Sequence, residues 1–466
     1  MYLLAAASSP GLWAPLLALV AGVAFVVAAV TQLRLHPFFA LILAAMLVGL
    51  LAPELPGDAS QSRWFRAVEL PLIEFGATAS KIALPIALAA VIGICLLESG
   101  AADSIVRALL RLTGESLSPL ALLAAGFLLS IPVFFDTVFL LLVPLARALA
   151  AQLQRRYVVS ILAICGGAVL THSLVAPTPG PLLMADNLDL DLGLTIALGI
   201  AAAAVCAIAV YPVSFLLEKW MPVPPPARKK VDGDDAGRPL PGFLISIMPV
   251  VIPVLLISAA SAAAFLPDAT PGGLRALLET AGHRNVALLA GAAVAVHLVV
   301  RTTGAGRYAL ERLLDPPFQT AGVIILITSA GGAFGAMISH AGAARIIESL
   351  AAGGGIDLVI LAWLVSAGLK AAQGSGTVAM ITASAMLAPT LAGNALPGQD
   401  LWVYLAIGFG SFALSWMNDS GFWVVARLSE FTETQTLRTW TLLLSTLSLL
   451  GLILVFAASR IAALFH

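Results

Sequence analysis

Apolar stretches of about 20 residues recur along this chain of 466 residues, and each is long enough to cross a lipid bilayer as a helix. Charged residues make up only 11% of the sequence, compared with about 25% in soluble domains. A spanning helix satisfies all of its backbone hydrogen bonds internally. The sequence therefore predicts an all-α polytopic membrane protein. Its formal net charge of −1 gives no indication of a nucleic-acid partner.

The expected membrane spans fall into two sets. They lie near 12–30, 38–53, 81–98, 157–184 and 192–217, and then near 243–266, 285–300, 318–338, 401–425 and 437–463. Two further apolar pairs are broken by polar tips and have limbs that are short for a full span, which predicts re-entrant hairpins. These pairs are 119–131 with 136–152 and 356–370 with 378–394. A short interfacial helix is expected around 59–75.

The segment 218–242 separates a first transmembrane repeat at 1–217 from a second at 243–466. It is rich in proline and charge and has no apolar period, so a solvated linker is expected. The positive-inside rule places it in the cytoplasm because it holds five basic residues, Lys219, Arg228, Lys229, Lys230 and Arg238. Counting spans outward from this linker places both termini on the external face.

The two halves of the chain repeat. Three pairs of segments match at an offset of about 241 residues, namely 97–109 with 338–350, 135–149 with 374–388 and 176–181 with 418–423. Each half has an odd number of spans, about five, plus one hairpin, so the second half is expected to be inverted relative to the first. Inverted repeats with broken helices near the midplane are typical of transporters, in which the breaks mark the substrate site.

The segment 368–389 combines a lysine with a Gly/Ser-rich tip inside an apolar region. Lys370 is the only lysine after Lys230, and a lysine at the bilayer centre costs about 2.5–3.5 kcal/mol on insertion scales. The tip offers polar groups, and glycines that allow a ligand to approach the backbone: Gln373, Gly374, Ser375, Gly376 and Thr377. We interpret Lys370 as the counter-charge of a substrate carboxylate. The alternative is an ion pair with Asp136 or Asp419 that only holds the fold.

Two breaks in the first half also carry polar groups. Asp136 follows a helix-breaking Pro132 and is either a proton or cation site, a polar lining of a cavity, or a helix cap. In 171–181, three prolines and a glycine free backbone N–H groups that favour an anion, and Thr178 adds a hydroxyl. His172 has its ordinary titration range near neutral pH, or it is a structural histidine bonded to a neighbouring helix.

The fourth break, 416–421, contains Asn418, Asp419 and Ser420. Asp419 is a candidate to take a coupling proton or to bond substrate hydroxyls, and the alternative is capping of a half-helix that starts at Gly421. Tryptophans near span ends are interpreted as membrane-interface anchors: Trp13, Trp220, Trp402 and Trp440.

Several functions lack sequence support. There is no Walker-type phosphate loop for ATP-driven transport, and no HExxH or GxSxG motif for a hydrolase. The three cysteines, Cys95, Cys165 and Cys206, lie inside apolar stretches without metal-ligand spacing. We therefore expect a membrane transporter rather than an enzyme, with no cofactor and no metal site.

Four motifs in the same order resemble those of the gluconate permease family (GntP type), within the ion transporter superfamily. They read IPVFFDTVFLLLVPLAR, THSLVAPTPGP, AAQGSGTVAMITASAMLAP and NDSGFW, and the likeness runs through nearly the whole chain. It implies proton-coupled uptake of a sugar acid at the bacterial inner membrane, by a homodimer with a scaffold domain and an elevator-like transport domain. By motif, the implied site is Asp136, Thr137, Thr178, Gly180, Gln373, Ser375, Thr377, Asn418, Asp419 and Ser420.

The chain departs from that family pattern at two positions. Thr178 stands where gluconate permeases usually have a histidine, and Lys370 stands where they usually have an arginine. A guanidinium holds a carboxylate through two parallel hydrogen bonds, which an ammonium cannot do. Both differences therefore bear on the expected anion site.

The expected function is proton symport of gluconate or a related small hydroxy-carboxylate. The carboxylate is expected to meet Lys370 and the half-helix N-termini, and the hydroxyls to bond Ser375, Thr377, Asn418 and Thr178. One or more of Asp136, Asp419 and His172 would carry the proton. The alternatives are a sodium-coupled carboxylate carrier or cation antiporter on the same fold, the membrane subunit of an ion-pumping decarboxylase complex, and a passive channel.

Overall fold

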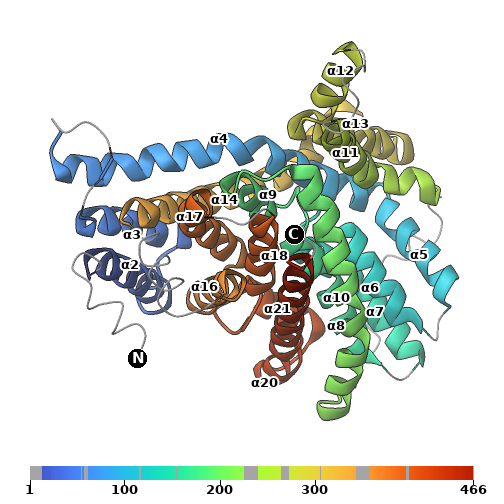
Figure 1. Ribbon diagram of the computed structural model, residues 1–466. Coiled ribbons are helices and arrows are strands. Elements are labelled where there is room, and N and C mark those ends of the chain that lie inside the picture. Colours follow the sequence, from blue (N-terminus) through green and yellow to red (C-terminus); the bar gives the residue numbers. More distant parts are fainter. Residues whose placement is uncertain are drawn as a thin grey trace.

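The computed structural model describes residues 13–53, 55–56, 61–114, 117–153, 156–224, 240–263, 272–304, 306–342, 357–394 and 398–464. These residues form helices joined by short connections, and no strand occurs among them (Figure 1). Seven helical segments of this described part are long and apolar enough to cross a membrane, which confirms the polytopic helical class: Arg63–Glu98, Tyr157–Asn187, Leu192–Trp220, Phe243–Ala263, Arg284–Thr303, Tyr308–His340 and Glu433–Ala462.

Among the described residues, nine helices precede the expected linker and the others follow it. The first set is α2 (Trp13–Thr31), α3 (Pro37–Leu51), α4 (Arg63–Glu98), α5 (Ala101–Thr113), α6 (Ser118–Leu129), α7 (Phe135–Leu153), α8 (Tyr157–Leu174), α9 (Pro179–Asn187) and α10 (Leu192–Trp220). The second is α11 (Phe243–Ala263), α12 (Gly272–Gly282), α13 (Arg284–Thr303), α14 (Arg307–His340), α16 (Leu358–Gln373), α17 (Gly376–Asn394), α18 (Gln399–Gly410), α19 (Ser420–Ser429), α20 (Glu433–Thr436), η2 (Leu437–Thr441) and α21 (Leu442–Ala462). Of the linker, 225–239 lie outside the described residues.

Two helices are longer than the sequence predicts. The expected interfacial helix around 59–75 and the span 81–98 are one continuous helix, α4, which passes through Pro71 and Pro85. Similarly, α14 passes through Pro316 and Pro317 and begins well before 318. The predicted separation in α4 was wrong because a helix packed against neighbours can absorb the hydrogen bond that a proline removes. Residues 57–60 lie outside the described part.

Other expected spans are shorter or broken. α3 has only 15 residues, fewer than the 20 or so that a straight span requires. The span expected at 401–425 is two short helices, since α18 ends at Gly410 and α19 begins at Ser420. The span at 157–184 breaks after Leu174, where Pro177 and Pro179 remove backbone donors. The predicted breaks are therefore present in the chain, at both positions.

The long helices α4 and α14 pack along each other, and each carries a partner from the other half of the chain. α3 packs on α14, whereas α13 packs on α4. Figure 1 shows α2 and α3 at one end of this pair and α11 and α13 at the other. The remaining helices form a bundle beside it, in which α8 packs on α6 and α10, and α18 packs on α16 and α21.

Helix starts recur at a fixed spacing. α7 begins at Phe135 and α17 at Gly376, while α9 begins at Pro179 and α19 at Ser420, so each pair is 241 residues apart. A short tip also precedes α7 and α17. Residues 130–134 join α6 to α7, and residues 374–375 join α16 to α17. The predicted match of 97–109 with 338–350 cannot be followed to its end, because 343–350 lie outside the described residues.

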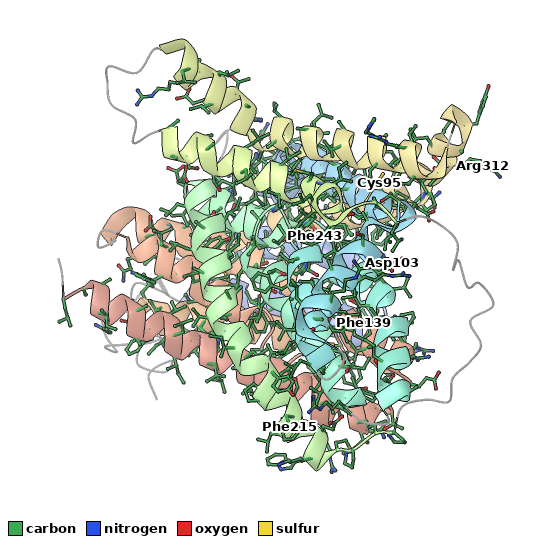
Figure 2. All side chains as sticks on the ribbon, turned by 90° about the vertical axis from the view of Figure 1, so that its right-hand side faces the viewer. Cys95, Asp103, Phe139, Phe215, Phe243 and Arg312 are labelled. Atoms are coloured by element: carbon green, nitrogen blue, oxygen red, sulfur yellow. The ribbon has the colours of Figure 1, made fainter. Side chains whose placement is uncertain are left out.

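The outer faces of the bundle are apolar. Side chains such as Ile208 and Phe215 on α10 and Leu255 on α11 are exposed, and Phe215 points outward near one end of the molecule (Figure 2). Exposed apolar surface of this extent requires a covering, which a lipid bilayer supplies. By contrast, the three cysteines are buried and unpaired, as their apolar surroundings indicate.

Candidate functional site

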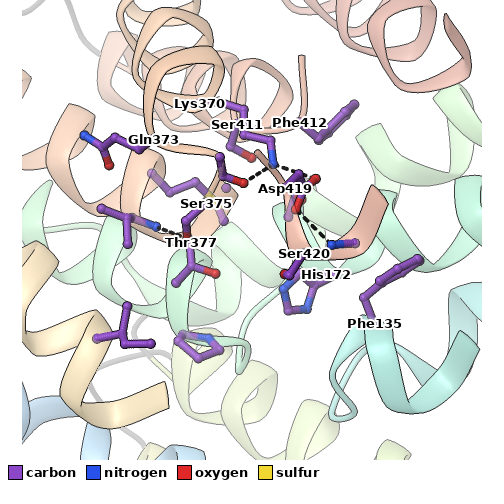
Figure 3. A pocket seen from close by; sticks show the side chains of 18 of the residues that line it. Phe135, His172, Lys370, Gln373, Ser375, Thr377, Ser411, Phe412, Asp419 and Ser420 are labelled. Carbon is purple, nitrogen blue, oxygen red and sulfur yellow. Dashed lines mark hydrogen bonds and ion pairs between the residues drawn. The ribbon is translucent and has the colours of Figure 1, made fainter. Parts of the chain in front are cut away.

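A cavity of about 410 Å³ lies where the four breaks meet (Figure 3). The chain reaches it from the tip before α7, from the break after α8, from the tip between α16 and α17 and from the break before α19. Ten of the thirteen predicted site residues line it: Asp136, His172, Lys370, Gln373, Gly374, Ser375, Thr377, Asn418, Asp419 and Ser420. Segments about 240 residues apart in sequence therefore bring these polar residues to one cavity.

Three predicted residues do not line this cavity, namely Thr137, Thr178 and Gly180. The Thr178 hydroxyl donates to the carbonyl oxygens of His172 at 2.8 Å and Val175 at 2.7 Å, so it holds the turn before α9. A methyl group on Gly180 would lie 2.2 Å from Met380 Cε. Gly180 thus permits close packing of α9 on α17. Both residues shape the break.

Lys370 is buried, with 3% of its side chain exposed, and it already has partners. Its Nζ lies 2.7 Å from Asp419 Oδ2 and donates to the Gly374 carbonyl oxygen at 2.6 Å. Of the two carboxylates that the sequence offered as partners, the fold selects Asp419. The ion pair links the last turn of α16 to the start of α19.

Asp419 caps α19, because its Oδ1 accepts from the Gly421 backbone N–H at 3.0 Å. Its Oδ2 accepts from the Ser415 hydroxyl in addition to facing Lys370. Trp440 donates its indole N–H to Ser415 Oγ at 3.1 Å. The carboxylate is therefore held from three sides, with a side-chain exposure of 13%.

Sequence reasoning missed Ser415 and misread Trp440. Trp440 is 2% exposed and its ring lines the cavity, so its prediction as an interface anchor was wrong. It lies in a π-helical turn, Leu437–Thr441, and such turns are frequent at functional sites. Other lining residues without a sequence signal are Phe134, Phe135, Phe412, Ser173, Ser411 and Thr328.

The two tip glycines make room for protein backbone. Gly374 adopts a left-handed φ of 82°, and a methyl group there would lie 2.1 Å from the Asn418 carbonyl oxygen. A methyl group on Gly376 would lie 2.7 Å from the Ser411 carbonyl oxygen. The predicted reason for these glycines, approach of a ligand, was therefore incomplete. Both positions also border the cavity, but the close contacts join the α16–α17 tip to the α18–α19 break.

Some polar groups on the wall have no protein partner. Both amide atoms of Gln373, which is 9% exposed, are buried without a hydrogen bond among the described residues. The same holds for His172 Nδ1 and Asn418 Oδ1, although Asn418 Nδ2 donates to the Ala371 carbonyl oxygen at 2.8 Å. Buried polar groups are normally hydrogen-bonded. Groups left unpaired around a cavity are suited to a polar ligand.

Asp136 differs from Asp419 in its surroundings. It lies in the first turn of α7, where the helix dipole favours a negative charge. Its side chain is exposed, and its carboxylate has no ion pair within the described part of the chain. His172, on α8, contacts Phe134 edge to face with ring centroids 6.3 Å apart. Thus the cavity combines one paired carboxylate, one unpaired carboxylate, a buried ammonium and an imidazole.

A helical bundle with apolar outer faces and charged groups gathered at broken helices around an internal chamber is the architecture of a multi-pass membrane transport protein. Comparison with known proteins agrees. The chain belongs to the GntP permease family, whose sequence model, described as "GntP family permease", matches residues 14–461. Its relatives are permeases and transporters, as expected for a protein that is not an enzyme.

Two relatives and one solved structure are similar along more than nine-tenths of their lengths. A gluconate permease of Pseudomonas aeruginosa is 33% identical over 443 residues, 93% of this chain and 94% of that protein. The low-affinity gluconate transporter of Escherichia coli K12 is 27% identical over 437 residues, 91% of this chain and 93% of that protein. The crystal structure of the Alcanivorax borkumensis YdaH transporter has a TM-score of 0.66 at 16% identity, over 92% of this chain and 99% of that one. This last likeness concerns the fold alone.

Proposed function

We propose that this protein is a secondary active transporter for gluconate or a related small hydroxy-carboxylate, driven by proton symport across the bacterial inner membrane. The observation that carries the proposal is the buried Lys370 together with the unpartnered amide of Gln373 in the wall of one cavity. Two similar proteins are named as a gluconate permease and a gluconate transporter, which supports the same substrate class.

The cavity wall offers a complementary set of groups for such a substrate. The ammonium of Lys370 attracts the carboxylate. The amide of Gln373, the free Asn418 Oδ1 and the hydroxyls of Ser375 and Thr377 can bond a chain of substrate hydroxyls. A volume of about 410 Å³ is within the range of about 300–1,000 Å³ for small-molecule sites. Asp136, Asp419 and His172 are the candidates for the coupling proton.

We further propose two inverted repeats, 1–217 and 243–466, joined by a cytoplasmic linker at 218–242, with both termini external. The equal spacing of helix starts supports this arrangement. It is also supported by the packing of α3 on α14 and of α13 on α4, since each pair joins helices from opposite halves of the chain. α10 and α21 also run in opposite directions side by side in Figure 1. The long α4 and α14 then belong to the scaffold of a homodimer, and the helices around the cavity to an elevator-like transport part.

The test is uptake by proteoliposomes that contain only the purified protein. Gluconate, other sugar acids and short hydroxy-acids are offered with an imposed proton gradient, an imposed sodium gradient or neither. We expect accumulation of at least one sugar acid when the outside is acidic. Accumulation driven only by sodium would mean that sodium, and not the proton, is the coupling ion. Equilibration without accumulation would indicate a channel. If this protein alone shows no uptake and a partner chain co-purifies with it, the result would support a subunit of a larger complex.

A further inference from the structure

A chain of hydrogen bonds runs from a buried tryptophan to the cavity lysine. Trp440 donates to Ser415 Oγ at 3.1 Å, Ser415 donates to Asp419 Oδ2, and this oxygen lies 2.7 Å from Lys370 Nζ. Trp440 is 2% exposed and Ser415 is fully buried. The chain joins η2, the break before α19 and the end of α16, and its last link is visible in Figure 3.

In this hydrogen-bonded arrangement the ammonium of Lys370 already has protein partners. The ammonium has three N–H donors, and it faces Asp419 Oδ2 and the Gly374 carbonyl oxygen in a pocket that exposes 3% of its side chain. Among the described residues that line the cavity, Lys370 is the only lysine or arginine, and Asp136 and Asp419 are the only carboxylates. Two of the three N–H donors are thus in use, and a substrate carboxylate that reaches this ammonium lies beside the carboxylate of Asp419, so that the two carboxylates compete for one positive charge.

The charge of the wall makes this competition costly unless a proton is added. With a neutral His172, Lys370, Asp136 and Asp419 give the wall a net charge of −1. An anionic substrate would increase this to −2 in a region of low dielectric, where like charges repel strongly. A second carboxylate facing one ammonium would also leave one of the two buried and unpaired.

We propose that Asp419 and the substrate carboxylate bind Lys370 in turn, with the coupling proton on Asp419, and that Ser415 and Trp440 are positioning residues for this exchange. The proposal rests on the proposed function. A proton from the solvent binds Asp419 Oδ2, the neutral carboxyl releases the ammonium, and the substrate carboxylate takes its place. The net charge of the wall is −1 before these steps, and the wall together with the bound substrate has the same charge of −1 after them. Release of the substrate and of the proton reverses these steps.

The other titratable groups do not have this connection. Asp136, on α7, has no ion pair in the described part of the chain, so its protonation would leave the Lys370–Asp419 pair intact. His172, on α8, contacts Phe134, and its Nδ1 is buried without a hydrogen-bond partner among the described residues. Of the described titratable groups in the cavity wall, Asp419 alone forms an ion pair with the ammonium that attracts the substrate.

The first test measures the affinity of the purified protein for gluconate, or for whichever sugar acid it takes up. The pH is varied from about 5 to about 9. We expect the Kd to rise about tenfold per pH unit above a midpoint, as one linked proton requires. In Asp419→Asn the Kd should not vary with pH, proton-driven accumulation should be lost, and exchange of labelled for unlabelled substrate should remain. An Asp419→Asn protein with the wild-type pH dependence would overturn the proposal.

The second test concerns the positioning residues. Ser415→Ala removes a donor to the charged carboxylate, so protonation becomes easier and the midpoint should move to higher pH by about one to two units. Trp440→Phe should move it less, in the same direction. The matched control is a second tryptophan–serine pair outside the cavity lining, in which Trp363 donates to Ser448 Oγ at 2.9 Å. Trp363→Phe and Ser448→Ala should leave the midpoint unchanged.

The outcomes separate this inference from the function on which it rests. If the wild-type protein neither binds nor transports any sugar acid or hydroxy-acid, both fall. If it binds one with an affinity that does not depend on pH, the substrate assignment stands and the role of Asp419 is refuted. An unmoved midpoint in Ser415→Ala, or an equal shift in the Trp363 and Ser448 controls, would refute the positioning role alone.

Discussion

The buried lysine is the residue with the largest consequence for anion binding. Lys370 is the only basic residue of the cavity wall apart from His172 in the described part of the chain, and its charge is compensated by Asp419. An unpaired charge in such a place is costly, whereas a paired one can be retained for function. Its substitution therefore tests the site most directly.

We expect Lys370→Ala to raise the Kd for the substrate about 10- to 100-fold, because a hydrogen bond to a charged group contributes about 1.5–3 kcal/mol. Lys370→Arg should keep part of the affinity, since a guanidinium also binds a carboxylate. The control is Lys81→Ala, which removes an ion pair with Asp186 outside the cavity. Binding by the purified protein measures all three, and full affinity in Lys370→Ala would refute the role.

Gln373 permits a separation of binding from stability. Its amide makes no protein hydrogen bond among the described residues, so Gln373→Met should not lower the temperature of thermal unfolding. If the amide bonds the substrate, the Kd should rise about tenfold. Thr382→Val is the control, because the Thr382 hydroxyl is also buried and unpartnered but does not line the cavity. An unchanged Kd in Gln373→Met would remove this residue from the site.

At the scale of elements, the function depends on how the broken helices are joined. The α16–α17 tip contacts the α18–α19 break through Gly374 and Asn418, and the ion pair of Lys370 with Asp419 crosses the same junction. Proline or glycine marks three of the breaks locally, whereas residues 411–419, between α18 and α19, include neither. The glycine contacts then fix the distance between the two broken segments, which determines the shape of the chamber.

We expect Gly374→Ala to lower the unfolding temperature and to abolish uptake. An alanine in the left-handed region costs about 1–2 kcal/mol, and its methyl group would lie 2.1 Å from the Asn418 carbonyl oxygen. The control is Gly398→Ala, with a φ of 78° and no atom of the described residues within 4 Å of the added methyl. It should lower the unfolding temperature less and retain uptake. Similar losses in both variants would mean that the contact with Asn418 is unimportant.

At the scale of the whole molecule, the proposed inverted arrangement makes the ends of α10 and α21 face opposite sides of the membrane. Cysteines introduced as Trp220→Cys and Leu464→Cys occupy exposed positions. The native Cys95, Cys165 and Cys206 are buried, so little background labelling is expected. A membrane-impermeant thiol reagent should label position 220 from the cytoplasmic side and position 464 from the outside. Labelling of both from one side would contradict the topology.

The sequence by itself determined the helical membrane class, the places where helices break and the charged residues that line the cavity. These follow from local physics, since apolar length selects a spanning helix and proline or glycine interrupts it. Prediction failed where the local sequence allows more than one structure. The prolines of α4 and α14 are absorbed within continuous helices, and Thr178 and Gly180 serve the turn and the packing around their break instead of the cavity.

Only the tertiary structure decided which groups meet. Lys370 had two possible partners in the sequence, and the fold brings Asp419 to it while Asp136 remains unpaired. The local sequence around Ser415 and Trp440 does not indicate that they meet, because the hydrogen bond between them depends on the packing of η2 against the break before α19. Contacts between distant segments depend on distances that no local pattern specifies. The charges of this site were readable from the sequence, but their pairing was set by the packing of the broken helices.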